Sequence, residues 1–183
     1  ADAAAVLHAL MELWGITDRK SDLADLPLSL GADVPVCMAS ETTQMGGIGE
    51  KLHPLTLTFP LYLLLVNPGV SVSTTDIFRA RADRNAAFSP FRKLPGEIAS
   101  LDQLKDILEG RRNDLEQDAC EAAPEIKKVL AQICKGDDCM GVGMSGSGAT
   151  CFGLFSTYES AHRLATEISR DFPTWWVRPV RVR

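Results

Sequence analysis

The chain has 183 residues, of which 45% are hydrophobic and 23% are charged, and its net charge is −5. This composition is that of a globular protein and excludes a disordered chain, a coiled coil and a collagen-like repeat. The longest apolar run, residues 59–66, is shorter than the roughly 20 residues of a membrane span. The basic residues form no stripe of the kind that nucleic-acid binding leaves, so we expect neither a membrane nor a nucleic-acid partner.

The cysteines and histidines favour a reducing compartment and no metal centre. Five cysteines are present, an odd number, and no two have CxxC spacing. This pattern argues against a disulfide framework and against a zinc site. The three histidines show no HxxxH spacing. We therefore expect a cytoplasmic location and assign no metal ligands.

Residues 1–14 are predicted to form an amphipathic helix that ends at Gly15. Its apolar side chains recur at helical spacing, and nothing precedes Ala1 to lead into the helix. We interpret this start as that of a chain cut from a longer protein. The apolar face of the helix would then be exposed unless a partner covers it, and a homodimer is one way to cover it.

The next segment contains a candidate loop and a domain boundary. Gly31 permits a turn, and Pro35 disfavours helix at Val34, so Asp33 is predicted to lie in a constrained loop. Residues 45–50 are small and flexible, and prolines at 54 and 60 bracket a boundary. We therefore predict two domains, residues 1–58 and residues 59–183.

The remainder of the chain alternates between strand and helix patterns. Asn67, Pro68 and Gly69 supply strong turn chemistry after the first strand, and Thr74 or Thr75 is expected to cap a short helix. Pro124 indicates a kink or two abutting helices within residues 113–133. The predicted strands are 61–66, 140–144, 151–155 and 175–182, and the predicted helices include 101–108 and 158–170. Residues 84–95 are expected to be loop. This order favours an α+β fold, a two-layer domain with an antiparallel sheet and helices on one side.

The segment Gly141–Thr150 is the strongest chemical signal in the sequence. Four glycines, two serines and a threonine lie between two predicted strands. Glycine lets backbone N–H groups approach an anion closely, so such a loop can cradle phosphate. It is neither a Walker A loop nor a dinucleotide fingerprint, because no Lys-Ser/Thr follows and it leads into a strand. A tight hairpin between packed strands explains the glycines equally well.

Asp33 is the second candidate. A carboxylate on a rigid turn can accept a hydroxyl proton or orient an attacking alcohol. A loop aspartate before Val-Pro can also be simply a cap or turn residue.

Five blocks of sequence together resemble the GHMP kinase superfamily. They occur in the family's order and spacing, and the resemblance covers nearly the whole chain. The blocks are residues 30–35 (LGADVP), 47–52 (GIGEKL), 66–74 (VNPGVSVST), 113–116 (NDLE) and 144–150 (MSGSGAT). The resemblance implies a GHMP kinase fold, with residues 1–58 as a remnant of the N-terminal nucleotide-binding domain and residues 59–183 as the C-terminal domain.

The resemblance is strongest to members that phosphorylate a cytidine-bearing sugar alcohol for isoprenoid precursor biosynthesis. It implies transfer of the ATP γ-phosphoryl group to the hydroxyl on C2 of an erythritol unit. Residues 1–4 look like the end of the family's glycine-rich phosphate loop. The glycines of that loop and the catalytic lysine would lie before Ala1, so we expect these 183 residues alone to be inactive.

The resemblance also implies roles for three residues that bind or activate the alcohol. Asp33 matches the family's catalytic aspartate, which accepts or polarises the hydroxyl proton. Phe78 matches an aromatic residue that stacks on the cytosine ring, although its place on a helix also fits a core residue. Thr74 would lie near the same substrate.

The phosphate side of the implied site has five further residues. Ser145 and Gly146 are expected to contact the substrate, and Ser147 and Gly148 to contact phosphate. Asp2 lies at the start of the helix that would bind the triphosphate, where a carboxylate is also expected simply to favour the helix dipole. ATP is implied as the phosphoryl donor, with Mg²⁺ as its companion.

Two other functions stay open. One is another GHMP kinase, acting on homoserine or mevalonate. The second is a non-catalytic domain that packs against a partner or binds a ligand weakly.

Overall fold

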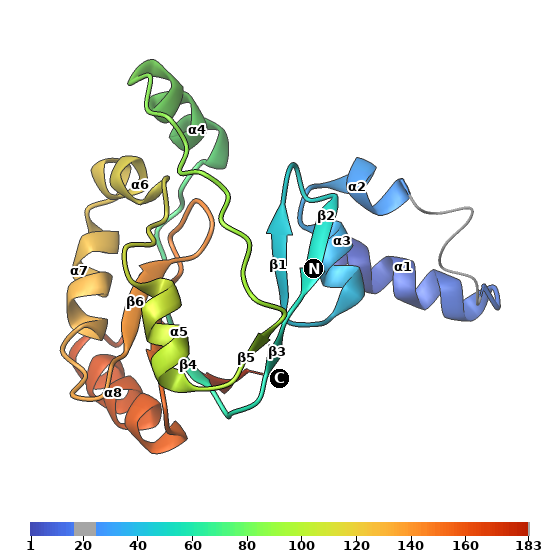
Figure 1. The fold of residues 1–183 in the computed structure, drawn as a ribbon. Coiled ribbons are helices and arrows are strands. Elements are labelled where there is room, and N and C mark those ends of the chain that lie inside the picture. Colours follow the sequence, from blue (N-terminus) through green and yellow to red (C-terminus); the bar gives the residue numbers. More distant parts are fainter. Residues whose placement is uncertain (17–24, 183) are drawn as a thin grey trace. The chain divides into compact units, whose positions relative to one another are not determined.

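The computed structural model describes residues 1–16 and 25–182, and Figure 1 shows their arrangement along the chain. The chain divides into two compact units. Within the described ranges, the first unit consists of residues 1–58 and 91–98, and the second of residues 59–90 and 99–182. The expected identity of residues 1–58 and 59–183 as two GHMP kinase domains stays a prediction.

The first unit begins with three helices. They are α1 (Asp2–Leu13), α2 (Leu26–Leu30) and α3 (Val34–Ala39). Helix α1 confirms the predicted helix, but it buries Ala4 and Met11, whereas the apolar side chains of Val6, Leu13 and Trp14 are exposed. It packs against α3, where His8 Nε2 lies 3.2 Å from the carbonyl oxygen of Met38.

Two small strand pairs complete the first unit. Strands β1 (Thr43–Gly46) and β2 (Lys51–Pro54) form an antiparallel hairpin, which the sequence analysis did not predict. The Glu50 carboxylate closes its turn by accepting the N–H of Ile48 at 2.7 Å. Hydrogen bonds from the backbone N–H groups of Glu50 and Ile48 hold the pKa of Glu50 below its ordinary value. Strand β3 (Thr56–Leu57) pairs in parallel with β5 (Glu97–Ile98).

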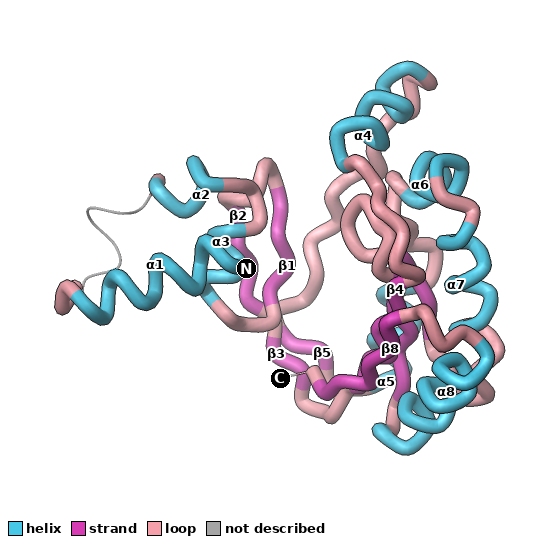
Figure 2. The backbone as a smooth tube through the Cα atoms, turned by 180° about the vertical axis from the view of Figure 1, so that it is seen from behind, coloured by secondary structure: helices cyan, strands magenta, loops and turns pink. Residues whose placement is uncertain are grey.

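The second unit is built on a four-stranded antiparallel sheet with the order β6-β7-β4-β8. The strands are β4 (Tyr62–Asn67), β6 (Gly141–Met144), β7 (Cys151–Phe155) and β8 (Trp176–Arg181). Its helices are α4 (Thr74–Asp83), α5 (Leu101–Leu108), α6 (Glu116–Ala122), α7 (Glu125–Ile133) and α8 (Tyr158–Asp171). Helices α7 and α8 pack against the strands, as Figure 2 also shows. The predicted α+β class, with an antiparallel sheet and helices, is confirmed.

The core of the second unit lies between this sheet and its helices. Leu64, Val66 and Phe155 from the strands are fully buried against α7 and α8. Burying one such side chain contributes about 1.5–3 kcal/mol. Gly153 allows the close approach of α7, because a Cβ there would lie 2.4 Å from Ile133 Cγ2.

Two local expectations were wrong. Pro35 was expected to disfavour helix at Val34, but Val34 is the first residue of α3. Pro35 falls in the first turn of that helix, where the N–H that proline lacks would have no partner within the helix. The cap of α4 is Ser73 rather than Thr74 or Thr75: its Oγ accepts the N–H of Asp76 at 3.3 Å. The helix also continues to Asp83, beyond the short segment expected.

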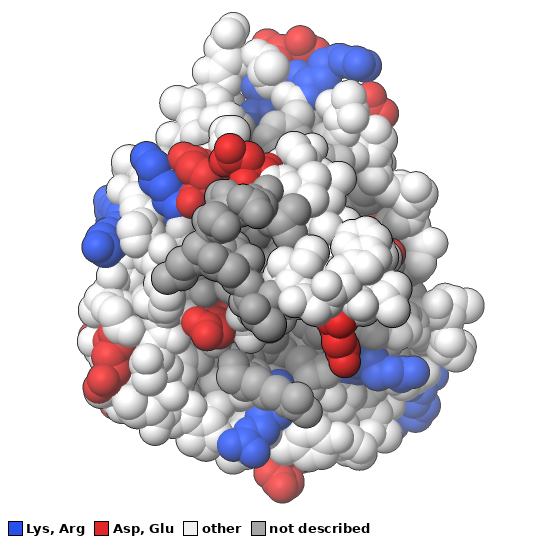
Figure 3. Space-filling model, turned by 90° about the vertical axis from the view of Figure 1, so that its right-hand side faces the viewer, with Lys and Arg blue, Asp and Glu red and all other residues white. Residues whose placement is uncertain are grey.

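On the face drawn in Figure 3, acidic and basic side chains are interspersed and form no single basic stripe among the described residues. None of the helices in the described part of the chain is long and apolar enough to cross a membrane.

Candidate functional site

The serine–glycine loop joins β6 to β7 as a tight hairpin. Ser145 donates its N–H to the Thr150 carbonyl at 2.9 Å, and Gly148 donates to the Ser145 carbonyl at 3.0 Å. Gly146 has a φ of +57°, in the left-handed region that favours glycine, although open space surrounds it. The interpretation of this segment as a tight hairpin is therefore correct for the backbone. Binding of a ligand by the same loop stays a prediction.

Side chains from three other segments hold this loop. Asn67 at the end of β4 donates from Nδ2 to Thr150 Oγ1 at 2.9 Å. Thr74 at the start of α4 shares a hydrogen bond with Ser147, with 2.7 Å between the hydroxyl oxygens. Asn113, just before α6, donates from Nδ2 to carbonyl oxygens of the loop region. The structure thus brings together two predicted site residues, Thr74 and Ser147, that are 73 positions apart.

Backbone donors remain available in the loop. Within the described residues, the N–H groups of Gly146 and Ser147 donate to no protein acceptor. Successive N–H groups around a left-handed residue form a concavity that suits an anion. The loop can therefore contact a phosphate oxygen without breaking the bonds that shape it.

Phe78 lies on α4, one turn after Thr74, so both residues lie on the same side of the helix. Its side chain is 47% exposed, whereas the neighbouring Ile77 is 2% exposed and fills the core position. The interpretation of Phe78 as a core residue is therefore wrong. The ring of Phe88 lies nearby, with centroids 6.5 Å apart and ring planes tilted by 42°, and the two exposed rings offer apolar surface.

A buried arginine links α4 to the residues that precede α6. Arg81 is 5% exposed and donates to the carbonyl oxygens of Asp114 and of Ala87, the latter at 2.6 Å. Its guanidinium lies over the Phe88 ring, 4.4 Å from the centroid. The pKa of the Asp114 carboxyl is lowered, chiefly by the hydrogen bond from the backbone N–H of Ser89 and further by neighbouring hydrogen bonds and positive charges. Burial of the carboxyl acts in the opposite direction.

Asp33 belongs to the first unit and is held by backbone geometry. It occupies the N-cap position of α3, but its exposed carboxylate accepts no capping hydrogen bond. A Cβ at Gly49 would lie 2.1 Å from the Ala32 carbonyl oxygen, and φ there is +105°, so only glycine permits this close packing. Two blocks of the sequence resemblance thus meet beside Asp33. The alternative role of its carboxylate as a helix cap is not what the structure shows.

Asp2 also lies in the first unit, as the first residue of α1, and its side chain is exposed. The remaining predicted residues, Thr74, Phe78 and the Ser145–Gly148 loop, lie in the second unit. Asp33 and the Ser145–Gly148 loop, to which the family resemblance assigns one reaction, belong to different units, and their common role stays a prediction.

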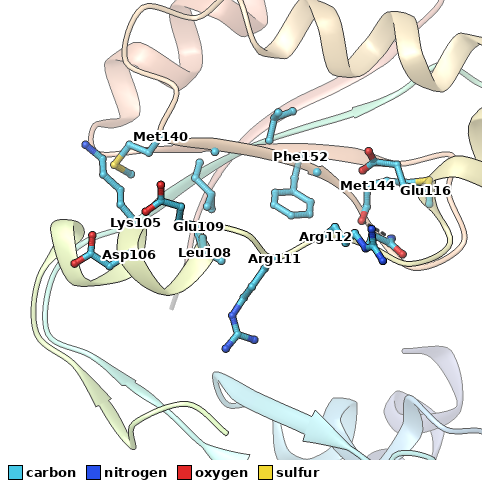
Figure 4. Close-up of a pocket in the computed structure, with 15 residues that line it drawn as sticks. Lys105, Asp106, Leu108, Glu109, Arg111, Arg112, Glu116, Met140, Met144 and Phe152 are labelled. Atoms are coloured by element: carbon cyan, nitrogen blue, oxygen red, sulfur yellow. Dashed lines mark hydrogen bonds between the residues drawn. The ribbon is translucent and has the colours of Figure 1, made fainter. Parts of the chain in front are cut away.

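A pocket of about 700 Å³ lies between α5 and the strands β6 and β7 (Figure 4). The ring of Phe152 forms part of its lining and covers Gly143, where a Cβ would lie 2.9 Å from the ring. Its lining includes Asn113 and Met144, which also take part in holding the loop, but none of the predicted site residues. Among the described residues, no group of three or more His, Cys, Asp or Glu side chains could hold a metal ion.

The sequence analysis assigned Asn67 only to a turn and gave Asn113 no role, although both lie in blocks that it quoted. The available signal was the position of each asparagine: Asn67 ends a strand, and Asn113 shortly precedes a helix. At such positions an amide often bonds to backbone two residues on, as both do here: Gly69 N–H binds Asn67 Oδ1 at 2.8 Å and Leu115 N–H binds Asn113 Oδ1 at 2.9 Å.

Comparison with known proteins gives a consistent family. Residues 92–174 match the family model described as GHMP kinases C terminal. Proteins named 4-diphosphocytidyl-2-C-methyl-D-erythritol kinase from Paramagnetospirillum magneticum and Cereibacter sphaeroides are 41% and 44% identical to this chain. Both alignments cover 100% of the chain, and they cover 63% and 64% of those proteins.

A solved structure agrees with these relatives. The crystal structure of a 4-(cytidine 5'-diphospho)-2C-methyl-D-erythritol kinase superposes with a TM-score of 0.71 at 33% identity. The match covers 97% of this chain and 63% of that one. The chain therefore spans slightly less than two thirds of the length of the relatives that it matches.

Proposed function

Because this chain carries a GHMP kinase C-terminal domain and is homologous over its whole length to 4-diphosphocytidyl-2-C-methyl-D-erythritol kinases, we propose that the complete protein is such a kinase. It would transfer the γ-phosphoryl group of ATP to the 2-hydroxyl of 4-diphosphocytidyl-2-C-methyl-D-erythritol, in isoprenoid precursor biosynthesis. The observation that carries this proposal is that the similarity extends beyond residues 92–174 to all of the chain.

The proposed reaction gives roles to residues from each unit. The carboxylate of Asp33 would take the proton as the substrate oxygen attacks the γ-phosphorus, and the bond from that phosphorus to the ADP oxygen breaks. The free N–H groups of Gly146 and Ser147 would bind phosphate or the substrate's erythritol end, supported by Ser145 and Gly148. Such catalysis depends on positioning and on neutralising phosphate charge. Asp2 is proposed to lie near the triphosphate.

Magnesium would arrive with ATP, since Mg²⁺ is commonly bound through substrate phosphates and one or two carboxylates. The described residues offer no cluster of three ligands, and we assign Mg²⁺ no protein ligands. We also propose a cytoplasmic location, which the free cysteines of the chain favour. A homodimer stays a prediction.

Replacing Phe78 by Ala should raise the KM for the cytidine-bearing substrate by about 5- to 100-fold, because stacking a base on an aromatic ring contributes about 1–3 kcal/mol. The KM for ATP should change much less. Steady-state kinetics with each substrate varied in turn measures both constants. Y158A is the matched control, because Tyr158 is also partly exposed, at 42%, but lies on α8. Equal effects of F78A and Y158A would contradict the stacking role.

The proposed function is tested by measuring ADP formation by the complete protein with three alcohols. We expect turnover with 4-diphosphocytidyl-2-C-methyl-D-erythritol and none with homoserine or mevalonate. Turnover with one of the other two alcohols instead would assign a different GHMP kinase activity. No turnover with any of the three would favour a non-catalytic role.

We further propose that a polypeptide of these 183 residues alone transfers phosphate negligibly, because the glycine-rich loop and lysine of the family have no counterpart in its sequence. The same assay on this polypeptide tests that point. Robust turnover would contradict it without weakening the assignment of the substrate.

A further inference from the structure

The side-chain amide of Asn113 joins two segments of the second unit. Its Nδ2 donates to the carbonyl oxygens of Met144 at 2.9 Å and of Gly146 at 2.7 Å. Its Oδ1 accepts the N–H of Leu115 at 2.9 Å. A primary amide has two hydrogens to donate, and both serve the serine–glycine loop, whereas the oxygen serves the local turn before α6.

The bond to Gly146 fixes the direction of the next N–H group. In a trans peptide unit the C=O and N–H bonds point in opposite directions. The Gly146 carbonyl is directed at Asn113, so the N–H of Ser147 is directed away from Asn113. The same reasoning applies to Met144, and there the opposite N–H, that of Ser145, is found to donate to the Thr150 carbonyl.

Asn113 also keeps carbonyl oxygens away from an incoming anion. An unpaired carbonyl oxygen in the loop would repel a phosphate oxygen, since both carry negative charge. With the Gly146 carbonyl bound to Nδ2, the loop can present N–H groups rather than C=O groups. The hydroxyl of Ser147 is held separately by Thr74, so both polar groups of Ser147 are fixed by side chains from other segments.

We propose that Asn113 is a positioning residue, which orients the Gly146–Ser147 peptide so that the Ser147 N–H binds a phosphate group. This proposal rests on the proposed function only for the identity of the phosphate. The free N–H groups suit an anion with an oxygen acceptor, and inorganic phosphate serves as the probe.

The N113D variant separates the two roles of the residue. It retains an oxygen to accept the Leu115 N–H, and it replaces the donor to Met144 and Gly146 by a second acceptor. We expect kcat/KM of the complete protein to fall about 100-fold, a size that misplacement of a catalytic group by about 1 Å can produce. The loss should lie mainly in kcat, with KM for the alcohol changed by less than about 3-fold, because the loop is proposed to act on phosphate in the transition state.

N85D is the matched control, because Asn85 is an exposed residue after α4 with the same chemical change and no assigned role. Its kinetics should equal those of the wild type. If N113D does not fold, as judged by its circular dichroism and thermal midpoint, N113A takes its place with the same measurements.

A second measurement does not depend on turnover. In ¹H–¹⁵N spectra of the complete wild-type protein, titration with inorganic phosphate should shift the amide resonance of Ser147, and in N113D this shift should be lost or weakened at least 10-fold in affinity. If the wild type has no kinase activity, the proposed function fails while this titration still tests Asn113. A Ser147 shift of equal size and affinity in folded N113D, or unchanged kcat in that variant, would overturn the proposal.

Discussion

In the complete protein, replacing Asp33 by Asn should lower kcat of the proposed kinase reaction by about 100- to 10,000-fold, the usual contribution of a positioned general base. The amide of Asn cannot take the proton of the substrate hydroxyl, yet it has nearly the shape of the carboxylate. KM for both substrates should change little, because the variant keeps a polar group of the same size. Measured kcat at saturating ATP and alcohol gives the result.

The structure supplies a close control for this prediction. Asp25 is also an exposed N-cap of a short helix, α2, with proline in the first turn and without a side-chain capping bond. D25N therefore makes the same chemical change in the same local setting and should leave kcat within about 2-fold of the wild type, as distant surface substitutions usually do. If both variants keep full activity, Asp33 is not the base.

Much of the second unit could be predicted from the sequence because local patterns and packing agree there. The helix predicted at residues 101–108 is observed with the same bounds. Residues 113–133 were expected to contain a kink or two helices at Pro124, and the structure has α6 and α7 on either side of it. For α7 the apolar spacing that indicated a helix is also the face that packs against the sheet, where Ile126, Val129 and Ile133 are buried.

The first unit was harder to predict because its pairings are remote or weakly patterned. Strands β3 and β5 contain two residues each, and Thr56 pairs with Glu97 although residues 59–90, which belong to the second unit, lie between them in the sequence. The turn at residues 47–50 was recognised only as a flexible stretch, although it joins the β1–β2 hairpin. Short strands with a mixed burial pattern carry too little periodicity to identify.

The candidate site also has a part that could be predicted from the sequence and a part that could not. The loop Ser145–Gly148 was identified from its composition, because glycine and serine together are typical of an anion-binding turn. Of the side chains that hold the loop, Thr74 was a predicted site residue, but its bond to Ser147 and the contacts of Asn67 and Asn113 were not predicted, since the partners lie 31–83 positions apart in the sequence. A single sequence gives residue types, but the choice of partner for an amide or hydroxyl is fixed only by the packing of the sheet and α4.

Replacing Arg81 by Met should produce the largest loss of stability that we predict. The side chain of Arg81 is 6% exposed, and its guanidinium binds the carbonyl oxygens of Asp114 and Ala87. Met fills a similar volume but leaves both carbonyls, whose bonds to Arg81 are part-buried, without this donor, which costs at most about 1–3 kcal/mol for each. It also removes the cation that lies 3.8 Å from Asp114 Oδ1.

The total loss should be about 3 kcal/mol in the free energy of unfolding, because Asp114 retains the N–H and hydroxyl of Ser89 as partners, at 2.6 Å and 2.8 Å. For a domain of this size, that corresponds to a decrease of about 6–12 °C in the thermal midpoint. Urea unfolding followed by circular dichroism measures the free energy, and calorimetry measures the midpoint.

R79M is the matched control, since Arg79 lies on the same helix and forms an ion pair with Asp76 at 3.3 Å. Both side chains of that pair are about two-thirds exposed, so water and salt screen it and its loss should change stability by less than about 0.5 kcal/mol. We therefore expect the buried Arg81, and not Arg79 with its exposed ion pair, to fix α4 in place. The positions of Thr74 and Phe78 on that helix then depend on Arg81. Equal destabilisation by R81M and R79M would show that burial of the Arg81 guanidinium contributes nothing specific to this anchoring.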